Sequence, residues 1–343
     1  VMFLSFLISN KFINITTGAK SNKMLPICFT ATDKMFMQNY KSQGPPIFVI
    51  NKSKGFKNNR MNSEIQRKSQ DTIHQKSISD MNEIQRQRKH LIQQICAKMK
   101  WNTTYYHEPD KNRKIIIIDK YHFQYCRIPK IGNTSWKRII LTLLGVIDNT
   151  DSEISFRKIH CHEYPTISLM EPNKNYTSFL FVRHPFQRIL SAYKDKILKS
   201  FEGDFQITRR QILSEYRQNV TDENSGADVS FPEFVKFLVN LKGNLNAHWD
   251  FQHTHCAVCE LSYDFIGHFE NLVEESNYLL HLLGINTIVF PKHEYSYHVT
   301  NSSEKDIYLN YFSQVSSEDI LKLYEFYKMD FELFGYSFPQ ELF

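Results

Sequence analysis

The chain has 343 residues, of which 41% are hydrophobic and 23% charged, and its formal net charge is +6. This length and apolar content suit one large α/β domain with a tail, or two small domains. The charge is uneven, because residues 1–114 hold 20 Lys and Arg against 7 Asp and Glu, whereas residues 115–343 hold 22 against 29. No helix-turn-helix, zinc-finger or RNA-recognition signature accompanies the basic front part, so we expect no nucleic-acid partner.

The front of the chain has two predicted parts. The first residues, VMFLSFLI, are apolar but too short to cross a bilayer, which takes about 20 residues. The chain begins with Val rather than Met, and these residues fit either the end of a truncated signal anchor or a frayed apolar terminus. From Asn10 to about Arg88 the sequence is rich in Lys, Asn, Ser and Gln, which predicts a disordered stem.

A helix is expected to lead from this stem into a folded domain. Apolar residues recur there at helical spacing, namely Ile84, Leu91, Ile92, Ile95 and Met99. We therefore divide the chain into an N-terminal remnant with a low-complexity stem, residues 1–88, and a domain, residues 89–343.

The first candidate binding motif is YCRIPKIGNTSWKRIILTLLG, residues 125–145. Residues 121–126 alternate like a strand, and Gly132 lies in a turn-forming segment where the backbone can approach a ligand closely. The helix that follows is predicted to be capped by Thr134 or Ser135 and to end at the glycine that closes the stretch. The motif therefore reads as a strand, a tight loop and a helix.

Cationic side chains gather at the start of this predicted helix. Lys130, Lys137 and Arg138 lie near its N-terminus, where free amides and the helix dipole already favour an anion. A phosphate-type ligand is the natural inference. The pattern is not a Walker A motif, because the lysine precedes the glycine and no G-K-[ST] follows. A basic loop that leads into an amphipathic helix without any ligand is the alternative.

A second strand–turn–helix follows later in the chain. Residues 178–182 (SFLFV) have the composition of a buried strand, and a helix is predicted after them through Lys199. Arg183, Arg188 and Ser191 are then able to converge on a second anion. Two anion sites at neighbouring strand ends suit a ligand with phosphates at both ends.

The segments CRIPKIGNTSWKR and FVRHPFQRILSAYKDK resemble the two nucleotide-binding signatures of Golgi carbohydrate sulfotransferases. That family includes chondroitin and dermatan 4-O-sulfotransferases, N-acetylgalactosamine 4-O-sulfotransferases and a glucuronyl 3-O-sulfotransferase. The resemblance extends to HWDFQHTHCAVCELSYDFIGHFENL and LKLYEFYKMDFELFGYSF, and so covers about Asp119 to Pro339. In the family, the first motif holds the 5′-phosphosulfate of PAPS (3′-phosphoadenylyl sulfate) and the second holds its 3′-phosphate.

The resemblance implies PAPS as co-substrate and no metal. The implied PAPS-binding residues are Pro129, Lys130, Ile131, Gly132, Asn133, Thr134, Ser135, Arg183, Arg188 and Ser191. Lys130 is also expected to be catalytic by stabilising the leaving phosphosulfate oxygens. Arg183 and Ser191 are assigned to the 3′-phosphate, whereas Arg188 is assigned either to that phosphate or to a structural role.

The acceptor hydroxyl needs a group that takes its proton, and His or a carboxylate usually does so. His248 falls where the family places a histidine ahead of its cysteine pair. We expect it to be the general base or a residue that positions the acceptor. The alternative is a structural histidine, hydrogen-bonded at the edge of Trp249.

The segment HTHCAVC, residues 253–259, resembles a metal-ligand cluster. One CxxC with adjacent histidines lacks a clear second half, and the family resemblance points to disulfides instead. We therefore predict disulfides and no metal. The chain has an even six cysteines, which fits an oxidising lumen. Glycosylation sequons, also typical of that route, occur at Asn14, Asn51, Asn102, Asn175, Asn219 and Asn301.

The expected fold is a single three-layer, P-loop-like α/β sulfotransferase domain with a mainly parallel sheet, preceded by the largely disordered stem. The ligand should lie at the carboxyl ends of the strands, where the two turns meet. The expected location is the Golgi membrane, as a single-pass type II protein with its catalytic domain in the lumen. The anchor would be the N-terminal one that is truncated here.

The function predicted from the motifs is sulfuryl transfer from PAPS to a hydroxyl of a glycan or proteoglycan. The resemblance leaves two acceptors, GalNAc at its 4-hydroxyl or glucuronic acid at its 3-hydroxyl. Asn133 favours glucuronic acid as the acceptor, because the 4-O-sulfotransferases of the family commonly have a cysteine at this position. Two rivals are a catalytically silent glycan- or nucleotide-binding protein of the same fold, and a nucleotide kinase with an unusual loop. For the kinase the sequence shows no compelling Walker B carboxylate.

Overall fold

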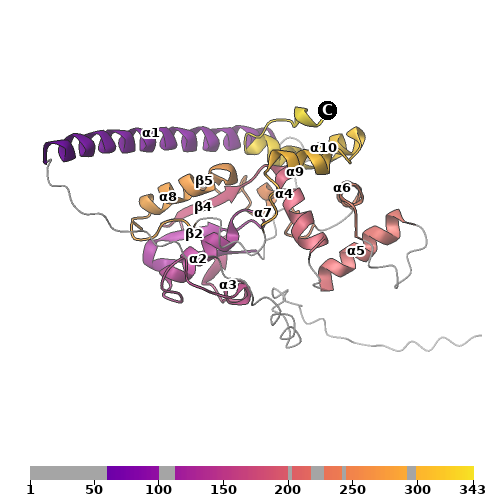
Figure 1. The fold of residues 1–343 in the computed structure, drawn as a ribbon, viewed down its shortest axis with the longest axis horizontal. Coiled ribbons are helices and arrows are strands. Elements are labelled where there is room, and N and C mark those ends of the chain that lie inside the picture. Colours follow the sequence, from indigo (N-terminus) through magenta and orange to yellow (C-terminus); the bar gives the residue numbers. More distant parts are fainter. Residues whose placement is uncertain (1–59, 100–112, 200–202, 218–227, 242–244, 292–298) are drawn as a thin grey trace, which may run out of the picture. The chain divides into compact units, whose positions relative to one another are not determined.

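The computed structural model describes residues 60–99, 113–199, 203–217, 228–241, 245–291 and 299–343 (Figure 1). All of them fall within one compact unit, residues 54–343. The predicted apolar terminus and most of the predicted stem lie outside the described residues. None of the described helices is both long enough and apolar enough to cross a membrane.

The described strands form one sheet in the order β3-β1-β2-β4-β5. They are β1 (Lys114–Ile118), β2 (Phe123–Cys126), β3 (Thr166–Ser168), β4 (Thr177–Val182) and β5 (Phe265–His268). β2, β4 and β5 are parallel neighbours, whereas β1 runs antiparallel to both β2 and β3. Four of the described strands therefore share one direction, which confirms the predicted mainly parallel sheet.

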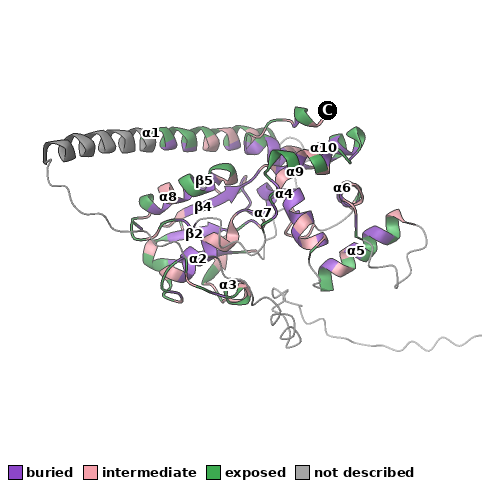
Figure 2. Ribbon diagram, in the orientation of Figure 1, coloured by how far each residue is buried: buried purple, intermediate pink, exposed green. Residues whose placement is uncertain are grey.

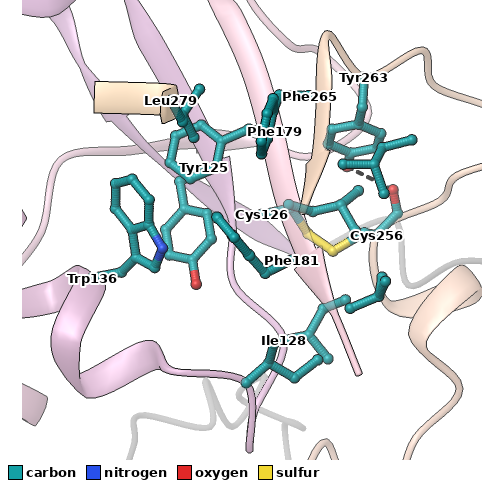
Figure 3. Close-up of a cluster of buried hydrophobic side chains, with 14 of the residues drawn as sticks. Tyr125, Cys126, Ile128, Trp136, Phe179, Phe181, Cys256, Tyr263, Phe265 and Leu279 are labelled. Carbon is teal, nitrogen blue, oxygen red and sulfur yellow. Dashed lines mark hydrogen bonds between the residues drawn. A yellow bond between two sulfur atoms is a disulfide. The ribbon is translucent and has the colours of Figure 1, made fainter. Parts of the chain in front are cut away.

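One face of the sheet carries an aromatic core (Figure 3). Register pairs Tyr125 with Phe179 and Phe179 with Phe265, so their rings line up across three strands. Trp136 of α2 (Asn133–Leu143) packs on this row, with its ring 4.8 Å from that of Phe179. Tyr278 of α8 (Leu272–Leu282) stacks 6.1 Å from Phe265. Helices α2 and α8 therefore cover the same face.

The opposite face is covered by other helices. Because successive strand residues point to opposite faces, Cys126 points away from the ring of Tyr125. It forms a disulfide with Cys256, directly after α7 (Gln252–His255). Helix α10 (Ser317–Leu333) packs against α7, where its Asp330 accepts from the backbone N–H of Gln252 at 2.8 Å. Helices on both faces confirm the expected three-layer α/β architecture.

A second buried cluster is formed mainly by helices (Figure 2). Besides α10, it includes α4 (Pro185–Ala192), α5 (Gly203–Tyr216), α6 (Phe231–Asn240) and α9 (Lys305–Phe312). Phe186 of α4 stacks on Phe312 at 5.1 Å and meets Phe331 edge-on at 5.2 Å. Helix α4 continues as a π-helical turn, Tyr193–Ile197. This packing fixes α4, which carries the second predicted binding motif, against the end of the chain.

The remaining described elements are short. α3 (Phe156–His160) follows α2, and 3₁₀ turns span Asp119–Tyr121, Phe269–Asn271 and Gln340–Leu342. The first of these turns takes Tyr121 out of the predicted strand, which therefore begins at Phe123.

Helix α1 (Arg60–Met99) protects the free edge of strand β5. The side-chain amide of Gln85 donates to the carbonyl of Ile266 (3.0 Å) and accepts from its N–H (2.8 Å). Arg88 forms a two-pronged pair of 2.7 and 2.9 Å with buried Glu275. These contacts satisfy backbone groups that would otherwise offer an open sheet edge. Gln85 and Arg88 lie before residue 89, in the part of the chain that we assigned to the stem. The division into a stem, residues 1–88, and a domain, residues 89–343, stays a prediction.

Disulfides explain the cysteine-rich segment that resembles a metal cluster. Cys259 bonds Cys96 of α1, while Cys256 bonds Cys126, so the CxxC pair tethers two different elements. Cys161 is disulfide-bonded as well. The predicted disulfides are confirmed, and the described residues contain no group of His, Cys, Asp and Glu side chains arranged to hold a metal.

Candidate active site

The shape of the first predicted turn is set mainly by its backbone conformation. Two of its residues have left-handed conformations, Lys130 with φ 72° and Gly132 with φ 63°. A Cβ on Gly132 would lie 2.5 Å from a methyl carbon of Leu272, so only glycine fits there without a shift. Helix α2 starts immediately afterwards and has no side-chain cap. The amides of its first turn, residues 133–135, are therefore available to an anion.

Other side chains of this loop define its inner wall. Ile131 is fully buried and anchors the loop in the core. The hydroxyl of Tyr125 donates to the side-chain oxygen of Asn133 at 2.8 Å. Pro129 and Ser135 are partly exposed at the same loop, as is Thr134. The structure thus brings the predicted residues 129–135 together in one turn.

Lys130 reaches across to a carboxylate that the sequence reasoning missed. Its Nζ lies 2.7 Å from Asp195 on the π-helical turn after α4, and Lys196 lies 3.7 Å from the same oxygen. Burial lowers the pKa of Lys130, and the charge of Asp195 opposes that shift. A buried lysine next to a carboxylate keeps its charge more readily than one left alone. The segment YKDK contained the signal, because it places an acid between two lysines just after the second motif.

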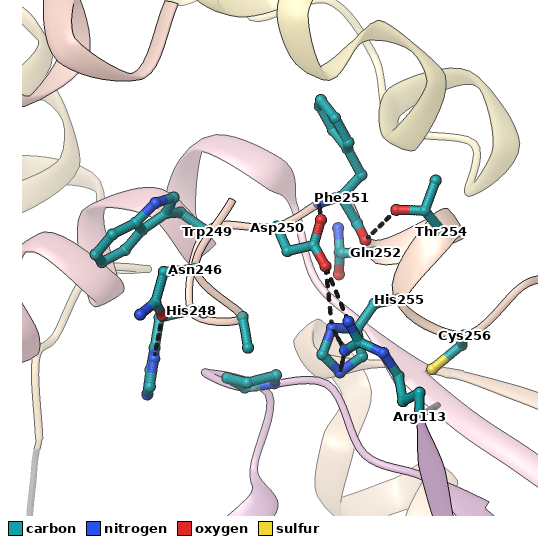
Figure 4. A network of polar contacts seen from close by, with 12 residues as sticks. Arg113, Asn246, His248, Trp249, Asp250, Phe251, Gln252, Thr254, His255 and Cys256 are labelled. Carbon is teal, nitrogen blue, oxygen red and sulfur yellow. Dashed lines mark hydrogen bonds and ion pairs between the residues drawn. The ribbon is translucent and has the colours of Figure 1, made fainter. Parts of the chain in front are cut away.

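His248 lies beside Asn246 (Figure 4), and the charge of Lys130 also acts on its imidazole. Burial lowers its pKa well below the usual value, and the charges of Lys196 and Lys130 add to this effect. Its Nδ1 lies 2.8 Å from Oδ1 of Asn246, an oxygen that also accepts from the His248 backbone N–H. Nδ1 must therefore carry the proton, which leaves Nε2 as an acceptor. A neutral imidazole with an open Nε2 suits a general base.

Arg183 occupies the carboxyl end of β4, as predicted, and joins the two turns. Its guanidinium donates to the carbonyl of Lys130 at 3.1 Å and to the hydroxyls of Ser302 and Ser303 at 2.8 and 2.7 Å. The group also stacks on Phe269, 4.1 Å from the ring centre. Burial lowers the pKa of Arg183 to about 10, where it is still charged at neutral pH.

The second turn is lined by hydroxyl groups. Ser191 lies 3.0 Å from the hydroxyl of Thr300, which in turn lies 3.2 Å from that of Ser302. Ser303 donates to Gln187 at 2.7 Å. The hydroxyl residues Thr300, Ser302 and Ser303 were missed from the sequence, although the run TNSS places them close together. One guanidinium with several neighbouring hydroxyls is suited to a phosphate.

Arg188 is fully buried and binds backbone rather than facing a ligand. It donates to the carbonyls of Pro129 (3.1 Å), Asp250 (2.6 Å) and Ala247 (3.1 Å). Of the two roles expected for this residue, these contacts favour the structural one. Arg188 holds the first turn and the segment that carries His248 in fixed positions.

Lys137 and Arg138, which also belong to the first motif, point inward. Arg138 is buried and donates to the carbonyls of Thr150 and Ser152, both at 2.9 Å. Lys137 is 4% exposed and lies beside His160 of α3 at 3.3 Å. Arg138 is therefore structural, whereas Lys137 remains a buried charge near the first turn.

The site joins two strand–turn–helix units, and each presents donors for an anion at the end of adjacent parallel strands. This arrangement suits a ligand that carries a phosphate group at each end. Residues 113–337 match the model of the sulfotransferase family. The chain therefore belongs to the sulfotransferase family, which confirms the resemblance found in the motifs.

Three curated relatives carry the name of carbohydrate sulfotransferases. The chain is 29% identical to mouse (Mus musculus) carbohydrate sulfotransferase 8 over 76% of this chain and 65% of the relative. It is 32% identical to rat (Rattus norvegicus) carbohydrate sulfotransferase 11 over 68% and 70% of the two chains. It is 34% identical to Xenopus laevis carbohydrate sulfotransferase 10 over 67% and 69%.

The match to the first of these relatives spans less than two thirds of the relative's length. No solved structure gives a significant match to the chain.

Proposed function

We propose that the protein transfers a sulfuryl group from PAPS to a hydroxyl of a glycan. The observation that carries the proposal is the direct link between the two turns, in which Arg183 of the second turn holds the carbonyl of Lys130 in the first. Two neighbouring anion sites suit the 5′-phosphosulfate and the 3′-phosphate of one nucleotide. The family of the chain and the names of its relatives support the same reaction.

The first turn is assigned to the phosphosulfate. Residues 129–135 surround it, with amides of the α2 N-terminus and the ammonium group of Lys130 directed at the bridging oxygen. The bond between sulfur and that oxygen breaks as the acceptor oxygen bonds to sulfur. Lys130 then stabilises the negative charge on the departing phosphate. Asp195 keeps Lys130 charged before the nucleotide enters.

The second turn is assigned to the 3′-phosphate. Arg183 and Ser191 donate to it, and Arg188 acts by holding the carbonyl of Pro129 in place. The Nε of Arg183 is buried without a hydrogen-bond partner among the described residues, which leaves a donor for a phosphate oxygen.

His248 is assigned as the general base. Its Nε2 accepts the proton of the acceptor hydroxyl as the oxygen attacks sulfur, while Asn246 holds the opposite ring nitrogen. Replacing His248 with alanine should lower kcat by about a hundredfold and leave PAP affinity unchanged. Unchanged turnover in a folded variant that still binds PAP would remove His248 from the mechanism.

The acceptor is proposed to be GalNAc at its 4-hydroxyl or glucuronic acid at its 3-hydroxyl. Asn133, in the first motif, favours the second of these. The protein is proposed to work in the Golgi lumen on a glycan or proteoglycan, as a type II membrane protein with an N-terminal anchor. Disulfides that join α1 and β2 to the α7 segment fit an oxidising compartment.

The test is transfer of labelled sulfate from PAPS to desulfated chondroitin, desulfated dermatan and a glucuronyl-terminated oligosaccharide, with Lys130→Ala as control. Transfer to one acceptor, lost in the control, would establish the activity and its branch. A folded protein that binds PAP but transfers to none of them would favour the catalytically silent alternative. Phosphoryl transfer from ATP with magnesium would favour the kinase instead.

A further inference from the structure

The short helix α7 is attached to the ends of both strands that lead into the two turns (Figure 4). Gln252, its first residue, is fully buried and binds Arg183, which directly follows β4. Cys256, which directly follows its last residue, is disulfide-bonded to Cys126, the last residue of β2. One turn of helix rises about 5 Å, and neighbouring strands also lie about 5 Å apart. A single helical turn is therefore long enough to bridge the ends of β2 and β4, which are neighbours in the sheet.

Gln252 binds both backbone groups of Arg183. Its side-chain oxygen accepts from the Arg183 N–H at 2.9 Å, and its side-chain amide donates to the Arg183 carbonyl, also at 2.9 Å. A residue on a neighbouring antiparallel strand makes the same pair of bonds, so the amide extends the sheet by one residue beyond the end of β4. Gln252 thereby fixes the orientation of the Arg183 backbone.

The position of Gln252 is itself fixed by the core. Its backbone N–H donates to Oδ2 of Asp330 at 2.8 Å, and Oδ1 of the same carboxylate accepts from the N–H of His253 at 3.0 Å. Asp330 lies on α10 and is fully buried. It therefore binds amides that the first turn of a helix leaves without an intrahelical partner. With Asp330 at one end of α7 and the disulfide at the other, Gln252 is a rigid support for Arg183.

The Arg183 backbone determines where one donor of its side chain points. The two outer nitrogens of the guanidinium donate to the carbonyl of Lys130 and to the hydroxyls of Ser302 and Ser303. The Nε is buried and has no hydrogen-bond partner among the described residues. Because Nε is bonded to the aliphatic part of the side chain, its position follows that of the backbone. Gln252 therefore controls the place at which Arg183 presents this donor.

We propose that Gln252 is a positioning residue that makes the second turn specific for a phosphate on the 3′ oxygen of a ribose over one on the 2′ oxygen. The inference rests on the proposed function, which assigns the 3′-phosphate to Arg183. The two oxygens are neighbours on the ribose ring, so Arg183 distinguishes them only if its donors are held in place. Because α7 also ties Gln252 to the end of β2, this donor is placed relative to the first turn, which holds the other end of the nucleotide.

The experiment measures, by calorimetry, the affinity of the protein for PAP (adenosine 3′,5′-bisphosphate) and for adenosine 2′,5′-bisphosphate. These isomers differ only in the position of one phosphate. The first variant is Gln252→Asn, which keeps the amide but is one methylene too short to reach both groups of Arg183. The second is Gln252→Glu, which keeps the length of the side chain and an acceptor for the Arg183 N–H and loses the amide donor.

Gln124→Asn is the matched control. Gln124 is buried, and its amide donates to the carbonyl of Asn173 (3.1 Å) and accepts from the N–H of that residue (2.9 Å). The control therefore shortens an amide that makes the same pair of bonds, before the amino end of β4 instead of at its carboxyl end.

The wild type should bind PAP at least about tenfold more tightly than the 2′,5′ isomer. Gln252→Asn should bring this ratio close to one, chiefly by weakening PAP, and Gln252→Glu should lower it as well. Gln124→Asn should keep the ratio of the wild type even if its melting temperature falls as far. A general loss of stability weakens both isomers alike, so the ratio separates positioning from a merely structural role.

An unchanged ratio in the folded Gln252 variants, or an equal change in Gln124→Asn, would overturn the inference. A wild type that binds PAP without preferring it to the isomer would overturn it whether or not the variants fold. Failure of the proposed function reads differently, as a wild type that binds neither isomer, and the inference then falls with it.

Discussion

The two turns that we assign to the anionic ends of the nucleotide are built by different means. In the first, backbone geometry does most of the work, with two left-handed residues, a glycine against Leu272 and the open amides of α2. In the second turn, side chains form the candidate site. Arg183 donates to the hydroxyls of Ser302 and Ser303, and Ser191 is hydrogen-bonded to that of Thr300. The first turn should therefore be sensitive to changes of shape, and the second to removal of individual donors.

Gly132→Ala is expected to lower both PAP affinity and stability, because it changes the shape of the first turn. A left-handed alanine costs about 1–2 kcal/mol, and its methyl group would also overlap Leu272. We expect PAP affinity to fall by at least about tenfold and the melting temperature to drop, as measured by calorimetry. Gly145→Ala is the matched control, with a similar φ of 70° but open space around the added methyl. Equal losses in both variants would show that the contact with Leu272 is unimportant.

Asp195→Asn removes the carboxylate that pairs with Lys130 of the first turn. Because the carboxylate raises the pKa of Lys130 against the effect of burial, its removal should lower that pKa. The basic limb of the kcat profile should then move to lower pH, since Lys130 loses its proton earlier. An exposed carboxylate on α5, changed in Asp204→Asn, is the control. An unmoved basic limb would mean that Lys130 is not the group that titrates.

The smallest expected effect comes from replacing His184. It changes how the free energy of unfolding depends on pH. Burial, with the charge of Arg183, lowers the pKa of His184 to about 4 from its ordinary value of 6.5. The unfolded chain therefore binds a proton in this range before the folded chain does. This residue's contribution to stability is present above pH 6.5 and is lost as the pH falls towards 4, by about 1 kcal/mol per pH unit at most.

Urea unfolding of wild type and His184→Asn between pH 7 and 5 measures this contribution. The variant should show a shallower loss of unfolding free energy than the wild type. Parallel curves would contradict the lowered pKa.

Much of the scaffold was predictable because local signals agree with it. The strand SFLFV and the glycine that ends α2 both lie where their patterns predict. The start of α1 at Arg60 was not predictable, because the segment that begins there lacks the apolar periodicity that marks a helix.

The site was predictable where a motif is local, and not where it is assembled from distant segments. Lys130, Arg183 and Ser191 belong to the two motifs and meet as expected. Asp195 and the hydroxyls of residues 300–303 reach the site only through packing of α4 against α9 and the π-helical turn. The structural contacts of Arg188 also depend on segments far along the chain, so its sequence position alone left two roles open.

The most direct test of the account compares binding of PAP and of AMP, which lacks the 3′-phosphate, to wild type, Ser191→Ala and Arg183→Ala. Arg183→Ala removes several buried hydrogen bonds and could impair folding. Ser191→Ala keeps the contacts of Arg183, so it tests the same assignment without that risk. The account predicts that the wild type prefers PAP by about a hundredfold, and that each variant loses much of this preference while binding AMP as before. Equal loss of PAP and AMP affinity, or no preference in the wild type, would contradict the assignment of the second turn to the 3′-phosphate.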